Sequence, residues 1–532
     1  MTDTLDPSGT ANARMRSDLE AGMQTTERKR GARWWLAVVL AATLAAAALS
    51  VAGAQTIDEL RRAVAERPAD ADAWTVLGNA LLAADDPAGA KEAYLEAIAI
   101  DYLVGDAHFG LGLVEFGRGD FAAALFSFTE VTRLFSDRFD GHFNRAVTLA
   151  RLRRPAESAA AFRRALAEAE PEATPEDRLN AWTGLGTQLV FAREPGSAAD
   201  AFAEALALNP EDTDLAYQRG SALLAAGRGL EALVELTDIE ARTSDYRFSV
   251  LIAEVYLEQG QVDRALRALE RAERKALEAG DRGGQAASLI ALGEIQRGLG
   301  RDADAIASYQ RAAQVDPSSW EARYAVGVAF LSAGQPRSAV APLLEAVALV
   351  PDNGDVRLAL ASAYDQLGQS GDALAAGREA LARAADAEAQ AQARFIIGRA
   401  LYLQGSYAAA ANEFAIVVQQ RPGSAMAQLW AGLAQYQQGD FGGATLFYER
   451  AVQLDPNAVA ARVNLGAAYL ATERYRDAEG VYRFLIQQNA RDAESLYHLG
   501  WALYAQQRDE DARASWTQSC QLGFQAACGA PR

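Results

Sequence analysis

The chain has 532 residues, half of them apolar and 23% charged, a composition typical of a folded protein too long for one compact core. Acidic residues outnumber basic ones by 70 to 51, and the formal net charge is -19. A surface of this sign repels nucleic acid, so no nucleic-acid partner is expected. Only three lysines occur, Lys29, Lys91 and Lys275, which leaves little scope for Schiff-base or P-loop chemistry.

The N-terminal region divides into two segments. Residues 1–33 are polar, end in the basic run "ERKRGAR", and are expected to form a disordered tail. Residues 34–54, "WWLAVVLAATLAAAALSVAGA", carry no charge and, at about 1.5 Å per residue, match the thickness of a bilayer core. An uncleaved transmembrane anchor is the favoured interpretation, and a signal peptide cleaved near Ala54, with a start at Met1 or Met23, is the alternative. Both interpretations place residues 55–532 outside the cytoplasm.

From residue 71 onward the sequence repeats. A small residue recurs thirteen times, and eight of the twelve gaps are 34 residues; the positions are Gly78, Gly112, Ala146, Gly186, Gly220, Ala253, Gly293, Gly327, Ala361, Gly398, Gly432, Gly466 and Gly500. Twelve residues after each lies a second small residue, and four residues further on nine repeats carry an aromatic side chain, such as Tyr94 or Trp516. Two columns in one register predict a helix-turn-helix repeat whose helices approach closely.

The stretch from Trp182, "WTGLGTQLVFAREPGSAADAFAEALALNP", resembles the tetratricopeptide repeat, with its W-x2-L-G-x2-Y, A-x3-F-x2-A and closing proline pattern. The resemblance covers residues 71 to about 526. It implies an all-α fold, a right-handed superhelical solenoid of about 13 helix-turn-helix repeats, preceded by one N-terminal transmembrane or signal helix. The chain is similar to membrane-anchored or exported bacterial members, which implies a single-pass protein of the cytoplasmic membrane, or a periplasmic one after cleavage.

Departures from the period suggest internal boundaries. The gaps from Ala146 to Gly186 and from Ala253 to Gly293 are 40 residues, and they contain the helix-breaking segments "PEATPEDR" and "GDRGGQ". A third gap of 37 residues surrounds "ADAEAQ". We interpret these segments as hinges or as lengthened second helices. The array then divides into a lead-in at 55–70, repeats 1–3 at 71–172, repeats 4–6 at 179–279, repeats 7–9 at 286–387, repeats 10–13 at 391–526, and a C-terminal cap at 527–532.

The two cysteines, Cys520 and Cys528, lie at the end of the array. Cys520 is expected late in the last repeat helix, and Cys528 in a short capping helix beyond a turn at Gly523. Their spacing resembles that of cysteine-rich helical-hairpin repeat proteins secreted by bacteria, and this resemblance implies a disulfide. Closing so short a loop would contribute roughly 2.5 kcal/mol. Two free, buried thiols are the alternative.

The sequence contains no H-E-x-x-H, G-x-x-x-x-G-K-[ST] or G-x-S-x-G motif. His108 and His142 are 34 residues apart, at a position where other repeats carry a packing tryptophan. We therefore predict no catalytic, metal-binding or cofactor-binding residues, and expect the chain not to be an enzyme.

The family resemblance implies a concave groove lined by the first helix of each repeat. Residues flanking the small residue of that helix would face the groove, and those three positions before it are uncharged in all thirteen repeats. The candidate partner-binding residues are Phe109, Phe143, Tyr217, Tyr324, Phe395, Arg399, Tyr402, Tyr436, Tyr497, Trp501 and Tyr504. Exposed aromatic residues are typical of binding hot spots, although packing against an adjacent hairpin is the alternative role.

These features predict a non-enzymatic scaffold or adaptor in the cell envelope, which binds polypeptide segments in an apolar, aromatic-lined groove to assemble protein complexes. The expected partners are proteins or peptides and, through residues 34–54, the membrane. The alternative is an accessory subunit of a polysaccharide-export or protein-glycosylation machine, in which the array positions a separate enzyme.

Overall fold

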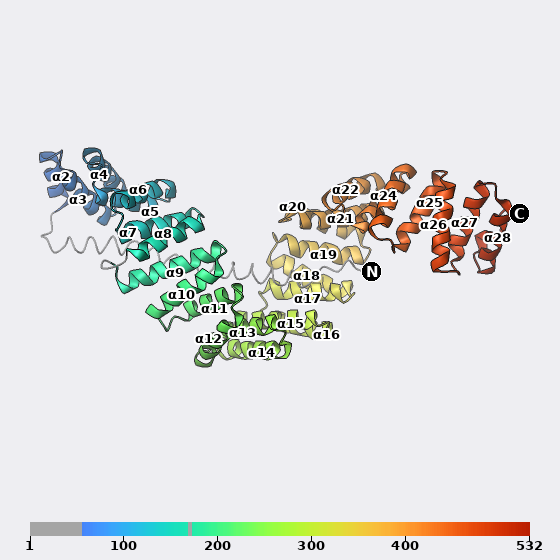
Figure 1. Cartoon of the computed structure of the whole chain (residues 1–532), viewed down its shortest axis with the longest axis horizontal. Coiled ribbons are helices and arrows are strands. Elements are labelled where there is room, and N and C mark those ends of the chain that lie inside the picture. The colour runs from blue at the N-terminus through green and yellow to red at the C-terminus, as the bar shows by residue number, and fades with distance from the viewer. Residues whose placement is uncertain (1–55, 169–172, 532) are drawn as a thin grey trace. The chain divides into compact units, whose positions relative to one another are not determined.

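A computed structural model describes residues 56–168 and 173–531, and within these ranges the chain is all-α, with 28 helices (Figure 1). The expected tail at 1–33 and the expected membrane or signal segment at 34–54 lie outside the described residues. No helix in the described ranges combines the length and apolar character needed to cross a membrane. The chain divides into two compact units, and the division falls between Gly284 and Gln285, within α15.

Unit 1 contains thirteen complete helices in its described part. They are α2 (Ile57–Glu66), α3 (Ala71–Ala83), α4 (Pro87–Ile100), α5 (Gly105–Gly117), α6 (Phe121–Leu134), α7 (Phe139–Arg151), α8 (Pro155–Ala167), α9 (Pro175–Phe191), α10 (Pro195–Leu208), α11 (Thr213–Ala225), α12 (Gly229–Arg242), α13 (Tyr246–Glu258) and α14 (Val262–Glu278).

Unit 2 continues from α15 to the C-terminus. Its helices are α15 (Arg282–Gly298), α16 (Asp302–Val315), α17 (Trp320–Ser332), α18 (Pro336–Leu349), α19 (Gly354–Gln366), α20 (Ser370–Ala382), α21 (Ala387–Leu403), α22 (Tyr407–Gln420), α23 (Ala425–Gln437), α24 (Phe441–Leu454), α25 (Val459–Ala471), α26 (Tyr475–Gln488), α27 (Ala493–Ala505), α28 (Asp509–Gln521) and α29 (Gln525–Cys528).

Helices α3 to α28 form thirteen consecutive pairs, and each pair corresponds to one repeat of the sequence. Within each unit a first helix packs on its own second helix, which in turn packs on the first helix of the next pair. The short turns between paired helices force neighbouring helices to be antiparallel, so each pair buries an apolar face that neither helix could bury alone.

Every pair turns at one residue in the left-handed backbone conformation, seven positions after the small residue of the first helix. Eight of these residues are glycines, for example Gly119 and Gly439 at φ +80° and +83°, and five are not: Asp85, Arg153, Arg193, Glu473 and Gln507. At Gly119 the turn also closes the helix end, because Asp120 N donates to the carbonyl oxygen of Glu115 at 3.0 Å. This third column of the repeat fixes where each first helix ends.

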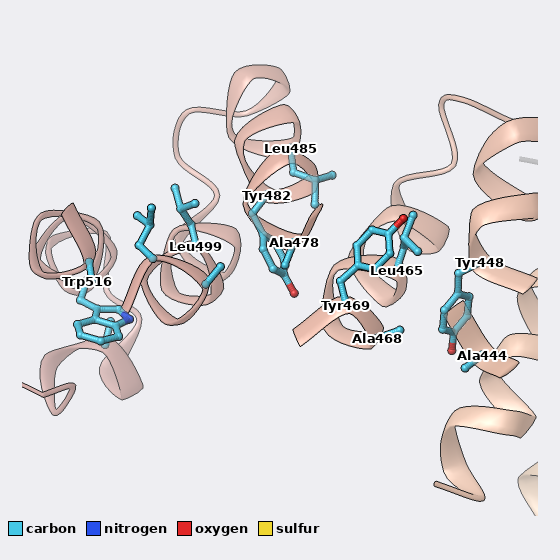
Figure 2. Packing of buried hydrophobic residues seen from close by; sticks show 14 residues of the cluster. Ala444, Tyr448, Leu465, Ala468, Tyr469, Ala478, Tyr482, Leu485, Leu499 and Trp516 are labelled. Carbon is cyan, nitrogen blue, oxygen red and sulfur yellow. The ribbon is translucent and has the colours of Figure 1, made fainter. Parts of the chain in front are cut away.

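The small residues of the repeat make room for aromatic rings. A Cβ added at Gly78 on α3 would lie 2.6 Å from a ring atom of Tyr94 on α4, and one added at Gly110 on α5 would lie 2.3 Å from the same ring. Tyr94 is fully buried, so the ring fills the space between its own repeat and the next. Tyr448, Tyr482 and Trp516 take the same position on α24, α26 and α28, where they form the core at the C-terminal end (Figure 2).

At each of the three long gaps the first helix is lengthened, and at the gap from Ala253 to Gly293 the second helix is lengthened too, as expected for that joint. Helices α9, α15 and α21 each have 17 residues, and among the second helices of these joints only α14 is equally long. At α9 the segment "ATPEDR" starts a helix instead of breaking one, because Pro175 occupies the first turn and Thr174 forms a capping box with Asp177. Asp386 is the N-cap of α21, and its side chain accepts a hydrogen bond from the Ala389 amide.

A helix outside the repeats packs on each end of the array. Helix α2 buries Leu60 and Val64 against the first repeat, and its other residues include Asp58, Arg61 and Arg62, which are exposed. Helix α29 packs on α28 at the other end. Such end helices cover apolar surface that a neighbouring repeat would otherwise cover.

Candidate partner-binding surface

All eleven candidate residues lie on first helices, in α5, α7, α11, α17, α21, α23 and α27. Ten of them are partly exposed, and Tyr504 is exposed, at 42%. None is fully buried, so each presents some side-chain surface to solvent. Their contacts differ between the two units, and those contacts decide which of them are accessible to a partner.

The three phenylalanine candidates that lie three positions before the small residue pack on the buried aromatic ring of their own repeat. Phe109 lies edge-to-face against Phe128, with 5.8 Å between ring centroids, and Phe395 lies 5.7 Å from Phe414 in the same geometry. Phe143 contacts Phe162 in the equivalent way. These residues therefore contribute to packing within the hairpin while one edge of the ring stays exposed.

In unit 1 an arginine of the next repeat covers two of these rings. The Arg138 guanidinium lies 5.0 Å from the centroid of Phe109 and forms an ion pair with Asp106, at 2.6 Å between Nη1 and Oδ1. Arg247 repeats the arrangement, 4.9 Å from Tyr217 and 2.9 Å from Asp214. The arginine thus holds two repeats together through a stacking contact and an ion pair.

In unit 2 the candidate Arg399 contacts residues of two neighbouring first helices. Its Nη1 donates to Asp365 Oδ2 on α19 at 2.8 Å, and its guanidinium lies 4.9 Å from the Trp430 ring on α23. Trp430 also packs edge-to-face on Tyr402, with 5.4 Å between centroids. Trp430 was not among the candidates; it lies two positions before the small residue, where the other repeats carry various residues, among them Gly110, Asn144 and His498.

The last repeat gathers the largest group of aromatic side chains. Trp501 lies 5.2 Å from Trp516 and 6.0 Å from Tyr504, and Tyr497 lies 6.2 Å from Trp501, all edge-to-face. Tyr497 also contacts Phe524 of the C-terminal cap at 5.1 Å. Trp501 and Tyr497 are thus partly packed against the core, whereas Tyr504 has the most exposed ring.

The first helices α21, α23, α25 and α27 together carry what we call the C-terminal first-helix surface. It consists of the residues three before, one after and four after the small residue of each helix: Phe395, Arg399, Tyr402, Leu429, Leu433, Tyr436, Val463, Ala467, Leu470, Tyr497, Trp501 and Tyr504. Eleven of the twelve are uncharged, six are aromatic, and all are at least partly exposed. In unit 1 the same positions include four buried residues, Thr75, Phe116, Val147 and Leu224.

Glu254 is a charged residue outside the predicted set of candidates. It lies on α13, one position after the small residue Ala253, and is only partly exposed. Burial raises the pKa of Glu254 to about 7, and the neighbouring Glu258 carboxylate adds to the shift. Burial also raises the pKa of Tyr217 to about 12, and Glu254 contributes to that shift as well. This part of the first-helix face therefore titrates near neutral pH.

The structure contains a disulfide between Cys520 and Cys528, with 4.9 Å between the two Cα atoms. Cys520 lies at the end of α28 and Cys528 in α29, on either side of Gly523 at φ +98°.

Among the described residues no group of three or more His, Cys, Asp or Glu side chains is arranged to hold a metal ion. His108 and His142 are buried, and each ring contacts a backbone carbonyl oxygen, of Tyr102 and Ser136 respectively.

Comparison with protein-family models gives two models described as tetratricopeptide repeat. One matches residues 54–102, 75–128, 109–173, 183–246, 290–354, 324–389, 358–425, 397–459 and 463–519. The other matches residues 246–318. The matches together cover most of the chain. None of the curated proteins matches it.

Among solved structures, the chain is similar to YrrB, described as a TPR protein with an unusual peptide-binding site. The two are 25% identical over 36% of this chain and 95% of YrrB, with a TM-score of 0.32. A tetratricopeptide repeat protein from Parabacteroides merdae is 16% identical over 49% of this chain and 100% of its own, with a TM-score of 0.37. MamA is 22% identical over 32% of this chain and 92% of its own, with a TM-score of 0.30.

Proposed function

The chain belongs to the tetratricopeptide repeat family, whose members are typically non-enzymatic scaffolds that bind protein or peptide partners, and from this premise we propose that it binds an extended apolar segment of a partner protein on the C-terminal first-helix surface. The observation that carries the proposal is the composition of that surface: eleven of its twelve residues are uncharged and six are aromatic, in a chain of net charge -19. A partly exposed apolar surface of this extent is characteristic of interaction sites.

The surface favours a partner with bulky apolar anchors. Helix α25 contributes Val463 and Ala467, which are smaller than the residues at the same positions of α23 and α27, such as Tyr497 and Trp501. A large apolar side chain of the partner would lie over α25 with aromatic residues on either side. Aromatic rings offer large contact area at low cost in conformational entropy, which suits such a site.

The binding proposal is tested with charge substitutions at exposed apolar residues of these helices. Tyr436 on α23 is partly exposed and Tyr504 on α27 is 42% exposed, and both belong to the C-terminal first-helix surface, so glutamate at each is expected to leave the helical circular dichroism unchanged. Recovery of the partner from a membrane extract should fall at least tenfold, because a central apolar anchor commonly contributes about 2 kcal/mol or more.

Leu446→Glu is the matched control. Leu446 is 68% exposed and lies on α24, the second helix of the same region, so its substitution adds the same charge away from the proposed surface. The control should recover the partner as the unmodified chain does. Equal loss in the control and the surface variants, or no loss in any variant, would place the partner-binding site elsewhere.

We also propose that residues 34–54 anchor the chain in a bacterial-type cytoplasmic membrane, with the repeats on the outer side and the cell envelope as the place of action. The proposal rests on the uncharged sequence of that segment and on α2, whose outward residues Asp58, Arg61 and Arg62 offer no apolar surface on which another helix could pack.

Fractionation of cells tests the anchor. We expect the full-length chain to stay in the membrane fraction at high salt, and protease added after the outer layers are opened to digest residues 55–532. A soluble protein whose N-terminal residue is Gln55 would show cleavage of a signal peptide instead. If residues 55–532 stay protected from protease after the outer layers are opened, the repeats lie in the cytoplasm.

A further inference from the structure

The C-terminal cap is a short segment that replaces the first helix of a further repeat. Helix α28 ends at Gln521, the chain turns at Gly523, and Phe524 N donates to the carbonyl oxygen of Ser519 at 3.1 Å. Helix α29 then has only four residues. A helix of this length has too few internal hydrogen bonds to form by itself in water, so it depends on contacts and covalent links with the rest of the chain.

The non-covalent contacts of the cap are few. Ala527 is the only residue of α29 that is buried, and the Phe524 ring lies 5.1 Å from the Tyr497 ring. Both residues pack against the core cluster that contains Trp516 and Leu499. The remaining link is the Cys520–Cys528 disulfide, which joins the end of α28 to the end of α29.

The cap adjoins the C-terminal first-helix surface. Tyr497 belongs to that surface, its ring contacts Trp501, and its carbonyl oxygen accepts a hydrogen bond from Trp516 Nε1 at 3.0 Å. Loss of Phe524 from its place would uncover one side of Tyr497 and open the last hairpin to solvent. The position of the cap and the accessible area of these aromatic residues are therefore coupled.

We propose that the Cys520–Cys528 disulfide is a redox latch, which keeps the cap on the last repeat when oxidised and releases it when reduced. Cys528 is exposed, so a thiolate can reach its sulfur. In the reaction with a dithiol, one thiolate attacks a sulfur of the bond and forms a mixed disulfide, and the other thiolate closes the reductant into a ring. Two electrons and two protons pass to Cys520 and Cys528, which become thiols.

Hydrogen exchange of the full-length protein, without any partner, measures the latch. The chain has only two cysteines, so any effect of a dithiol on the amides reports this bond. We expect the amides of residues 522–531 to exchange faster after reduction, by up to roughly 70-fold, the factor that the chain-entropy model gives for a loop of this length. Amides of α19 to α22, several repeats away, should not change.

A double variant provides the control. Cys520→Ser with Cys528→Ser should exchange like the reduced chain, and the dithiol should have no effect on it. Mass spectrometry after alkylation records the state of the thiols in each sample. Alkylation of both cysteines without reduction would overturn the proposal, as would reduced and alkylated cysteines with exchange at 522–531 unchanged. Because no partner is present, this result is independent of whether the proposed binding surface is correct.

Discussion

Arg399 on α21 forms an ion pair with Asp365 on α19, with 2.8 Å between Nη1 and Oδ2. The Asp365 side chain is only 8% exposed, and burial raises its pKa even though Arg399 opposes the shift. The same guanidinium lies on Trp430 of α23. This one side chain of α21 therefore links its own helix to the first helices before and after it, α19 and α23. Arg399, a predicted partner-binding residue, therefore also holds neighbouring repeats together.

Arg399→Met should destabilise α19 to α23 by about 2 to 4 kcal/mol at neutral pH, because it leaves a buried carboxyl group without its partner. Methionine keeps much of the side-chain length, so packing on Trp430 is largely retained. Hydrogen exchange in these helices measures the loss. The double variant with Asp365→Leu should recover most of the stability, and a double variant whose loss is the sum of the two single losses would show that the pair is not coupled.

Glu254 gives the repeats around α13 a dependence on pH. Its pKa rises from 4.5 to about 7 on folding, so the folded chain holds a proton that the unfolded chain releases between these values. The stabilisation is complete below about pH 4.5 and is lost as the pH rises through about 7. Glu254→Gln should therefore stabilise α13 by about 3 kcal/mol at pH 8 and have a much smaller effect at pH 5.

Denaturation at the two pH values checks this prediction. Glu258→Gln is the control, because Glu258 is exposed and acts on Glu254 only through its charge. Its effect at pH 8 should be smaller than that of Glu254→Gln. Equal stability of Glu254→Gln and the unmodified chain at pH 8 would show that Glu254 titrates as an ordinary carboxyl group.

The left-handed turn of each repeat predicts two substitutions of opposite effect. Gly439 has φ +83° and no atom within 4 Å of an added Cβ, so Gly439→Ala should destabilise its hairpin by about 1 kcal/mol through the backbone alone. Glu473 has φ +59° at the same position of the next repeat, and Glu473→Gly should relieve a similar strain. Thermal unfolding measures both, and shifts of the same sign would contradict the prediction.

Two buried tyrosines at the same repeat position should respond differently to loss of the hydroxyl. The Tyr94 hydroxyl donates to Asn79 Oδ1 at 2.7 Å, and Tyr94→Phe should destabilise the chain by about 1 kcal/mol. The Tyr448 hydroxyl is buried without a hydrogen-bond partner among the described residues, so Tyr448→Phe should be neutral or slightly stabilising. Chemical denaturation compares the two, and equal losses would contradict the assignment.

The repeat itself could be predicted because its structural causes are local and recur in one register. The sequence shows a glycine or alanine at the position of Gly78 and, in most repeats, an aromatic residue at the position of Tyr94. In each unit the structure places such pairs against each other. The turn column could have been found by the same reasoning, since eight of its thirteen residues are glycine. The turn position is harder to recognise in the other five repeats, because residues such as Arg153 and Glu473 do not by themselves indicate a left-handed conformation.

The lengthened first helices were not expected from the sequence, again for a local reason. The segment around Pro175 has the composition of a helix breaker, yet its proline stands in the first turn of α9 and its Asp177 completes a capping box that starts this helix. The same residue types act as breakers inside a helix and as initiators at its beginning. Only the position of the helix end distinguishes these roles.

The sequence by itself determined that the chain is a tetratricopeptide array of thirteen hairpins, because period, small residues and aromatic rings are properties of single repeats. Tertiary structure alone decided which polar side chains cross between repeats. The pairing of Arg399 with Asp365 joins residues 34 positions apart, and that of Arg138 with Asp106 joins residues 32 apart, by side-chain directions that no column of the sequence specifies. Tertiary structure also decided how much of each aromatic ring stays exposed, since the exposure of Tyr504 and the burial of Trp516 depend on how neighbouring helices pack around them.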